Sequence, residues 1–160
     1  MNKTKQLTTA AIIAALYTVL TYLTNLFGLA NGVIQVRFSE MLTVLPVLTP
    51  AAIPGLTVGC LLSNLLTGCA LWDVIFGSFA TLLGALGTRY FAGKLLHKPY
   101  LAPVFPVLSN AAIVPLVLRY TYGAEGSLLY FAATVGAGEI LSAGVLGTLL
   151  LITLKKRKIF

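Results

Sequence analysis

The run LTTAAIIAALYTVLTYLTNLFGL, residues 7–29, decides the class of this protein, because it holds no charged side chain. An α-helix needs about 20 apolar residues to cross the hydrocarbon core of a bilayer. The run is too long for the hydrophobic core of a cleaved signal peptide, which has about 7–15 residues, and it lacks a convincing cleavage site. We therefore predict a retained transmembrane helix at 7–29.

The rest of the chain has the composition of an integral membrane protein. Hydrophobic residues make up 58% of its 160 residues, charged residues make up 9%, and the mean hydropathy is +0.95. Soluble domains carry about 25% charged residues, so this composition excludes an ordinary soluble protein. The length leaves room for one transmembrane domain, residues 1–160, and for no soluble enzyme domain beside it.

Apolar runs downstream predict five further membrane helices. The segment 38–68 is too long for one helix, and Pro46, Pro50 and Pro54 interrupt it. Because each proline removes a backbone donor, we interpret the segment as a hairpin of two shortish helices. The predicted fold is an all-α bundle of six transmembrane helices at 7–29, 36–49, 51–67, 71–93, 100–122 and 127–154.

The basic residues predict the orientation of this bundle. Cytoplasmic loops of membrane proteins are enriched in Lys and Arg. With both termini in the cytoplasm, nine of the 11 basic residues lie inside and two lie outside. The inner set is Lys3, Lys5, Arg89, Lys94, Lys98, Lys155, Lys156, Arg157 and Lys158, and the outer set is Arg37 and Arg119. A count of five helices would place the basic C-terminal run outside, so six is preferred.

Acidic residues gather in the outer half of the predicted bundle. Glu40, Asp73 and Glu125 fall there, and Glu139 lies about twelve residues into its helix, roughly 18 Å deep at 1.5 Å per residue. Ionisable groups within membrane segments are energetically costly and usually mark a path for a substrate or an ion. The outer half is therefore expected to form the mouth of a binding site.

Several polar candidates also have a purely structural interpretation. Arg37 and Glu40 are three residues apart and can pair with each other on a helix. Asp73 can be a carboxylate at a helix N-terminus, where the helix dipole favours it. Trp72 can be an interfacial anchor. For Glu139 a ligand contact is the preferred interpretation, since a carboxylate at mid-depth needs a partner.

Small residues line one face of the first predicted helix. Ala10 and Ala14, and likewise Ala11 and Ala15, are four residues apart and stack into a smooth surface. Such surfaces let helices approach closely in lipid. Either another part of this chain or a partner protein can cover this face. The pair Gly55 and Gly59 leaves the same choice open, with packing inside the chain preferred.

Motifs for ATP binding, catalysis and metal binding are missing from the sequence. A phosphate-binding loop requires G-x-x-x-x-G-K-[ST], and the nearest candidate, 87–94, fails in its glycine spacing and in the residue after the lysine. Cys60, Cys69 and His97 are too few for a structural zinc site. We therefore expect no enzyme activity, no metal and no cofactor, with any ATP used by partner subunits.

Several stretches resemble the QueT family of membrane proteins. These are QVRFSEMLTVLP at 35–46, TPAAIPGL at 49–56, GCLLSNLL at 59–66, DVIFGS at 73–78 and GE at 138–139. The resemblance covers nearly the whole chain. It implies an S component of an energy-coupling factor (ECF) importer in the cell membrane, which binds a queuosine precursor. It also implies two ATPase subunits and a transmembrane coupling protein, which would dock on Ala10, Ala11, Ala14 and Ala15.

The ligand implied by this resemblance is a 7-deazaguanine base or queuine, and the candidate residues suit it. A carboxylate can accept the paired N–H groups of the pyrimidine edge with charge-assisted strength. We expect Glu139 to read this edge, Asn64 and Gln35 to assist, and Trp72 to stack on the flat ring. Asp73 or Glu40 would meet the amine of an aminomethyl form, and Arg37 would serve the ring acceptors.

Two other functions remain open at this point. The chain can be a stand-alone secondary transporter that uses Glu139 as an ion or proton relay. It can also be an S component for a different vitamin, since the sequence does not distinguish one small ligand from another.

Overall fold

The computed structural model describes residues 2–29 and 35–157, and every regular element in these two ranges is helical. The predicted basic residue Lys158 lies outside the described residues. The elements are α1 (Lys3–Leu26), η1 (Phe38–Val47), α2 (Ala52–Leu66), α3 (Leu71–Gly87), η2 (Thr88–Leu95), η3 (Pro99–Leu101), α4 (Val104–Tyr120), α5 (Leu128–Glu139), η4 (Ile140–Leu146) and α6 (Gly147–Lys156).

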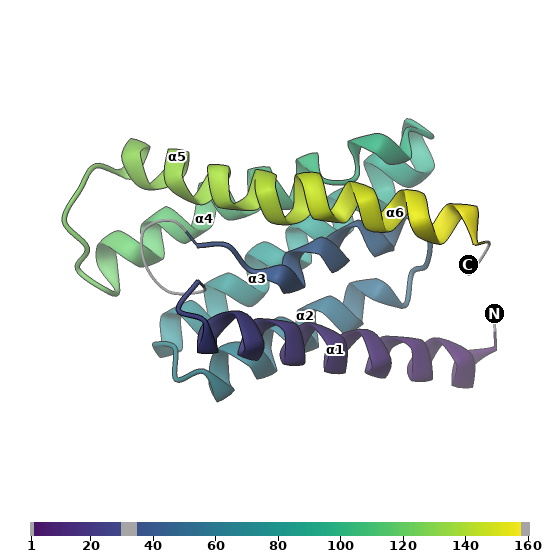
Figure 1. Cartoon of the computed structure of the whole chain (residues 1–160), viewed down its shortest axis with the longest axis horizontal. Coiled ribbons are helices and arrows are strands. Elements are labelled where there is room, and N and C mark those ends of the chain that lie inside the picture. Colours follow the sequence, from purple (N-terminus) through teal and green to yellow (C-terminus); the bar gives the residue numbers. More distant parts are fainter. Residues whose placement is uncertain (1, 30–34, 158–160) are drawn as a thin grey trace.

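The helices lie along one long axis, and the start of α1 and the end of α6 are found at the same end of the bundle (Figure 1). Four of the described helical stretches are long and apolar enough to cross a membrane, namely Lys3–Leu26, Leu71–Leu95, Pro99–Tyr120 and Leu128–Lys156. The stretches Phe38–Val47 and Ala52–Leu66 are apolar but shorter. The chain is thus an all-helical, multi-pass membrane protein, and its proline-rich segment forms two short helices as predicted.

The first of these short helices, η1, differs from the sequence prediction. It is a 3-10 helix of 10 residues with Pro46 inside it, where an ordinary helix was expected at 36–49. Such runs seldom exceed 3–4 residues, because the hydrogen bonds of a 3-10 helix have poorer geometry than those of an α-helix. Arg89 stabilises its end, because Nη1 donates to the carbonyls of Pro46 (3.2 Å) and Val47 (3.3 Å).

Helices α1 and α2 meet through small residues. A Cβ added at Gly55 would lie 2.7 Å from the Ala10 carbonyl, and one added at Gly59 would lie 3.0 Å from the Ala14 carbonyl. Ala14 is buried, whereas Ala11 and Ala15 are exposed. The alanine face is therefore divided: Ala10 and Ala14 pack inside the chain against Gly55 and Gly59, and only the other two remain open to a partner.

Candidate functional site

A polar cavity lies between the N-terminal end of η1 and helices α3, α4 and α5. Its cavity volume is about 10 Å³. The room inside suffices for roughly one water molecule, so a larger ligand requires the walls to move apart. The lining residues are Gln35, Arg37, Glu40, Asp73, Gly77, Thr81, Asn110, Val114, Val135 and Glu139.

Helical spacing accounts for the lining of α3. Asp73, Gly77 and Thr81 follow one another at intervals of four residues and so share a face. Asp73 lies in the first turn of α3, and Thr81 lies two turns further along. This face of α3 therefore presents the carboxylate of Asp73, then Gly77 with no side chain, and then the hydroxyl of Thr81.

The register of α3 against α4 follows from contacts at both ends. Near the end of α3, a Cβ at Gly84 would meet the Pro106 Cα at 2.9 Å. At its start, Asp73 accepts a hydrogen bond from Tyr122, just beyond α4. The two helices thus run antiparallel, with Thr81 at the level of Asn110.

The register of α4 against α5 gives the cavity distinct layers. Asn110 is hydrogen bonded to Glu139, and one turn away Val114 packs in one cluster with Val135. The cavity consequently has a polar layer at Glu139, an apolar layer at the two valines, and a second polar layer at Asp73.

Glu139 is 8% exposed, at the junction of α5 with the π-helix η4. The Asn110 Nδ2 donates to its Oε1 over 2.9 Å, while its Oε2 has no hydrogen-bond partner among the described residues. The neighbouring Gly138 lies directly against the backbone of Gln35, where a side chain would clash. This contact brings the segment before η1 onto α5, beside the carboxylate.

Glu40 is 2% exposed and approaches the cavity from η1. The hydroxyl of Tyr17 on α1 donates to its Oε1, and its Oε2 has no hydrogen-bond partner in residues 2–29 and 35–157. Arg37 donates from Nη2 to Gln35 (3.1 Å), and its Nε is also unpartnered. The direct Arg37–Glu40 pair, which was one interpretation of the sequence, is not formed in the described structure.

Asp73 is 6% exposed and is held by the polypeptide that follows α4. The Tyr122 hydroxyl donates to Asp73 Oδ2 (2.9 Å) and accepts from the Ala70 backbone N–H (3.1 Å). Partial burial raises the pKa of the Tyr122 hydroxyl above its usual value; the Ala70 bond opposes this shift and Asp73 adds to it. The hydroxyl therefore stays protonated and able to donate.

Three of the six buried side-chain atoms that lack a hydrogen-bond partner in the described structure belong to residues that line this cavity. Most buried polar groups in native proteins have a hydrogen-bond partner. Here Arg37 Nε, Glu40 Oε2 and Glu139 Oε2 have none, and all three residues line the same space. Two acceptors and one donor are thus available to a ligand.

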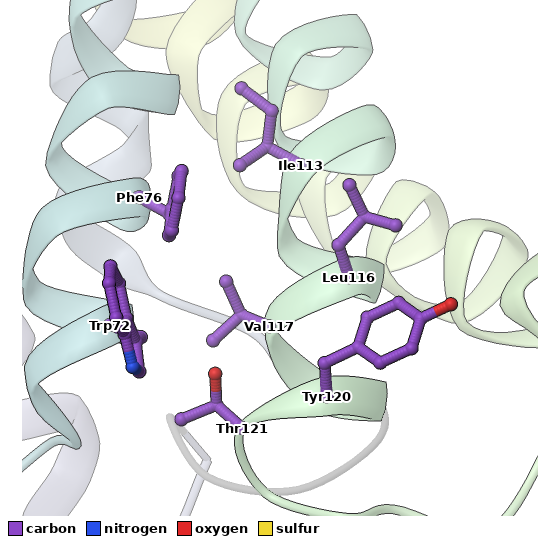
Figure 2. Close-up of a pocket in the computed structure, with 7 residues that line it drawn as sticks. All are labelled: Trp72, Phe76, Ile113, Leu116, Val117, Tyr120 and Thr121. Atoms are coloured by element: carbon purple, nitrogen blue, oxygen red, sulfur yellow. The ribbon is translucent and has the colours of Figure 1, made fainter.

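Two predicted site residues lie outside the cavity lining. Asn64, on α2, is 1% exposed; its Nδ2 donates to the Asp73 carbonyl (3.4 Å) and would lie 3.0 Å from a Cβ added at Gly77. Trp72 is 56% exposed and stacks on Phe76, with ring centroids 5.7 Å apart. It faces a separate apolar surface pocket with Val117 and Thr121 (Figure 2). The structure therefore does not bring Trp72 to the polar side chains, and the interfacial-anchor interpretation suits its exposure better than stacking.

Sequence reasoning missed four polar residues of the site. Asn110 and Thr81 line the cavity, while Tyr17 and Tyr122 hold its carboxylates. Asn110 carried a usable signal, since an amide inside an apolar span needs a partner. Among the described residues, no three Asp, Glu, His or Cys side chains come together in a group that could hold a metal ion.

Comparisons with known proteins agree with this transmembrane architecture. The sequence model of the QueT transporter family matches residues 7–156. A curated relative, the Queuosine precursor transporter QueT of Lactococcus lactis subsp. cremoris (strain MG1363), is 33% identical over 151 residues, which cover 88% of this chain and 87% of that protein. No solved structure matches. The chain therefore belongs to the QueT transporter family, and it is a transporter protein and not an enzyme, as the sequence predicted.

Proposed function

We propose that this chain is the substrate-capture subunit, or S component, of an ATP-driven ECF importer for a queuosine precursor. The observation that carries the proposal is the buried cavity with three carboxylates, one guanidinium and several unpartnered polar atoms. The related Lactococcus protein is named a queuosine precursor transporter, and a 7-deazaguanine has the hydrogen-bonding groups that this cavity lacks.

The ligand fits the cavity by its chemistry. Its pyrimidine edge offers adjacent N–H donors, which the free Oε2 of Glu139 accepts with charge-assisted strength. Its carbonyl or ring acceptor takes a hydrogen bond from Arg37, whose Nε is unpartnered. Val114 and Val135 cover the faces of the flat ring. Gln35 completes the site by orienting Arg37.

The bundle crosses the cell membrane six times, with both termini in the cytoplasm. The start of α1 and the end of α6 share one end of the bundle (Figure 1), which an even number of crossings requires. The basic residues of α1, η2 and α6 support the orientation through the positive-inside rule. The short helices η1 and α2 form the remaining two crossings.

Energy comes from partner subunits in this proposal. The sequence has no phosphate-binding loop, so two ATPases and a transmembrane coupling protein would drive transport. Ala11 and Ala15 are exposed on α1 and offer the coupling protein a close approach. Ala10 and Ala14 support that surface from within, through their contact with α2.

Mass spectrometry of the small molecules that co-purify with the chain tests the ligand. We expect a 7-deazaguanine to be released when the protein is denatured. Release of a different vitamin would leave the S-component proposal intact but would overturn the assigned ligand. Complete absence of a bound molecule, together with no binding of added 7-deazaguanine, would overturn substrate capture itself.

A second function is favoured by one observation: the unpartnered Oε2 of Glu139 lies mid-way along a membrane helix and can carry a proton. A stand-alone secondary transporter would use it as a relay. Vesicles that contain only this chain separate the two functions. We expect uptake only when the coupling protein, the ATPases and ATP are added, whereas uncoupler-sensitive uptake by the chain alone would establish the relay.

A further inference from the structure

An apolar groove between α3 and α4 has no part in the proposed ligand site. Its volume is about 390 Å³, and pockets that bind small molecules have about 300–1,000 Å³. Figure 2 shows its walls: Trp72 and Phe76 of α3 lie on one side, Leu116 and Tyr120 of α4 lie on the other, and Val117 lies between them. The groove is therefore large enough to hold a molecule of its own.

The groove opens on the part of the bundle surface that faces lipid. Its residues of α3 and α4 belong to two stretches, Leu71–Leu95 and Pro99–Tyr120, that are long and apolar enough to cross a membrane. The rings of Trp72 and Tyr120 are 56% and 75% exposed, whereas Val117 at the bottom is 3% exposed. The groove thus has open walls and a closed floor, and the molecules that can reach it in a membrane are lipids and transmembrane segments of other proteins.

The length of the groove suits one acyl chain. Its lining extends along α4 from Ile113 at one end to Thr121 at the other (Figure 2), and eight residues of α-helix rise about 12 Å. The hydrocarbon core of a bilayer is about 30 Å thick, so each leaflet contributes about 15 Å. An acyl chain that lies in the groove would contact it over most of the depth of one leaflet.

A transmembrane helix of another protein suits the groove less well. Helices approach each other in lipid over small residues, as α1 approaches α2 at Gly59. None of the residues that line the groove is Gly, Ala or Ser. A helix about 10–12 Å wide would contact the rings of Trp72 and Tyr120 before it reached Val117, whereas a slim and flexible hydrocarbon chain can lie between these rings.

Polar groups gather at one end of the groove. The indole nitrogen of Trp72 lies at the same end as the Thr121 hydroxyl (Figure 2). Arg119 is exposed in the last turn of α4, and its Nη1 donates to the Gly126 carbonyl. Trp and Tyr rings are enriched at the interfaces between membrane and water, and Arg forms strong hydrogen bonds to phosphate. This end therefore suits the head group of a lipid, and the Ile113 end suits its hydrocarbon tail.

We propose that the groove between α3 and α4 is a phospholipid site, which holds one acyl chain between Trp72 and Tyr120 with the phosphate at the Arg119 end. The chain packs on both helices close to the hydrogen bond of Tyr122 to Asp73 (2.9 Å). A bound phospholipid thus supports the helix pair at the end of the polar cavity. The proposal is independent of the ligand that the polar cavity takes.

Fluorescence quenching tests the site, because Trp72 is the single tryptophan of the chain and reports on the groove alone. The purified, full-length chain in detergent is titrated with phosphatidylglycerol that carries bromine on its acyl chains, since bromine quenches an indole ring only at close contact. We expect quenching that saturates at a single lipid per chain. Quenching that rises in proportion to the lipid content of the micelle, without saturating, would overturn the proposal.

Variants assign the quenching to the groove. Tyr120→Ala removes one wall and leaves Trp72 in place, and we expect the lipid concentration at half quenching to rise about tenfold, because a large contact with the acyl chain is lost. Tyr120 is 75% exposed, so the melting temperature without lipid should be unchanged. Tyr100→Ala, at a tyrosine of η3 that is 65% exposed, is the matched control and should be quenched like the wild type.

Two results with the variants or with a partner would contradict the site. Equal half-quenching concentrations for Tyr120→Ala and the wild type would show that the lipid does not lie between Trp72 and Tyr120. Loss of the quenching when the coupling protein is added would show that a protein surface covers the groove in place of a phospholipid.

Discussion

The side-chain amide of Asn110 on α4 donates to the Glu139 carboxylate on α5 over 2.9 Å, and it leaves the second carboxylate oxygen without a partner. This bond orients Glu139 while keeping one acceptor available. It joins two helices at the deep polar layer of the cavity. The arrangement makes Asn110 a positioning residue for the proposed ligand contact.

The variant Asn110→Ala should therefore weaken ligand binding without abolishing it. Loss of the amide leaves a buried oxygen unsatisfied, at a cost of about 1–3 kcal/mol, and frees the carboxylate to rotate. We expect about a tenfold loss in affinity for 7-deazaguanine by calorimetry, with Asn110→Gln restoring part of it. Unchanged affinity in the alanine variant would show that Glu139 is positioned by other contacts.

The variant Tyr17→Phe should destabilise the protein, because it removes the only hydrogen bond that the described residues make to the buried carboxylate of Glu40. The expected cost is again about 1–3 kcal/mol, seen as a lower melting temperature in detergent. Tyr22→Phe on the same helix is the matched control, since Tyr22 is 48% exposed. Equal melting temperatures for the two variants would contradict the role given to Tyr17.

The variant Gly59→Ala should disturb the α1–α2 contact. Its new Cβ would lie 2.8 Å from the Tyr17 Cβ and 3.0 Å from the Ala14 carbonyl, so the helices must separate. We expect a lower melting temperature. Gly136→Ala is the matched control, because its Cβ would meet only the Ala111 Cβ at an ordinary 3.8 Å. If Gly59→Ala has a melting temperature equal to or higher than that of Gly136→Ala, the close packing of α1 on α2 is refuted.

The variant Ala11→Trp tests the proposed docking surface. Ala11 is exposed, so the bulky ring should leave folding and ligand binding intact while abolishing ATP-driven uptake in the reconstituted complex. Val19→Trp, at another exposed position of α1, serves as the control and should transport normally. Normal uptake by Ala11→Trp would show that the coupling protein does not dock at Ala11. Ala14→Trp is a poor test, because Ala14 is buried against α2.

The variant Trp72→Leu should bind 7-deazaguanine as tightly as the wild type. The indole ring is 56% exposed and stacks on Phe76, outside the polar cavity. A loss of affinity of about tenfold would instead support the stacking role that the sequence suggested, since stacking on an aromatic ring contributes about 0.5–1.5 kcal/mol beyond area burial.

Charged residues in apolar sequence predicted which side chains gather around one cavity, and their role in binding a ligand stays a prediction. Arg37, Glu40, Asp73 and Glu139 were expected to act together, and the structure places all four around one cavity, because burial in a membrane bundle requires such groups to share partners. Neutral polar residues such as Tyr17 and Asn110 were missed, since their side chains also occur at structural positions in membrane helices.

The sequence did not show which way each helix is rotated about its axis, and this limited the prediction of which side chains face the cavity. Trp72 and Asp73 are adjacent on α3, and adjacent residues on a helix do not face the same way. Since Asp73 faces the cavity, Trp72 cannot. The same rule separates Ala10 and Ala14, which face α2, from Ala11 and Ala15. Sequence spacing identifies which residues share a face but not which neighbour covers it.

Calorimetric titration of 7-deazaguanine into the purified chain, compared with its Glu139→Gln variant, tests the central claim most directly. Glutamine keeps the size of the side chain and its bond to Asn110 but removes the negative charge that accepts the paired N–H groups. We predict that the wild type binds and that the variant binds about tenfold more weakly or worse. Equal affinity of the two proteins would contradict the claim that Glu139 reads the ligand.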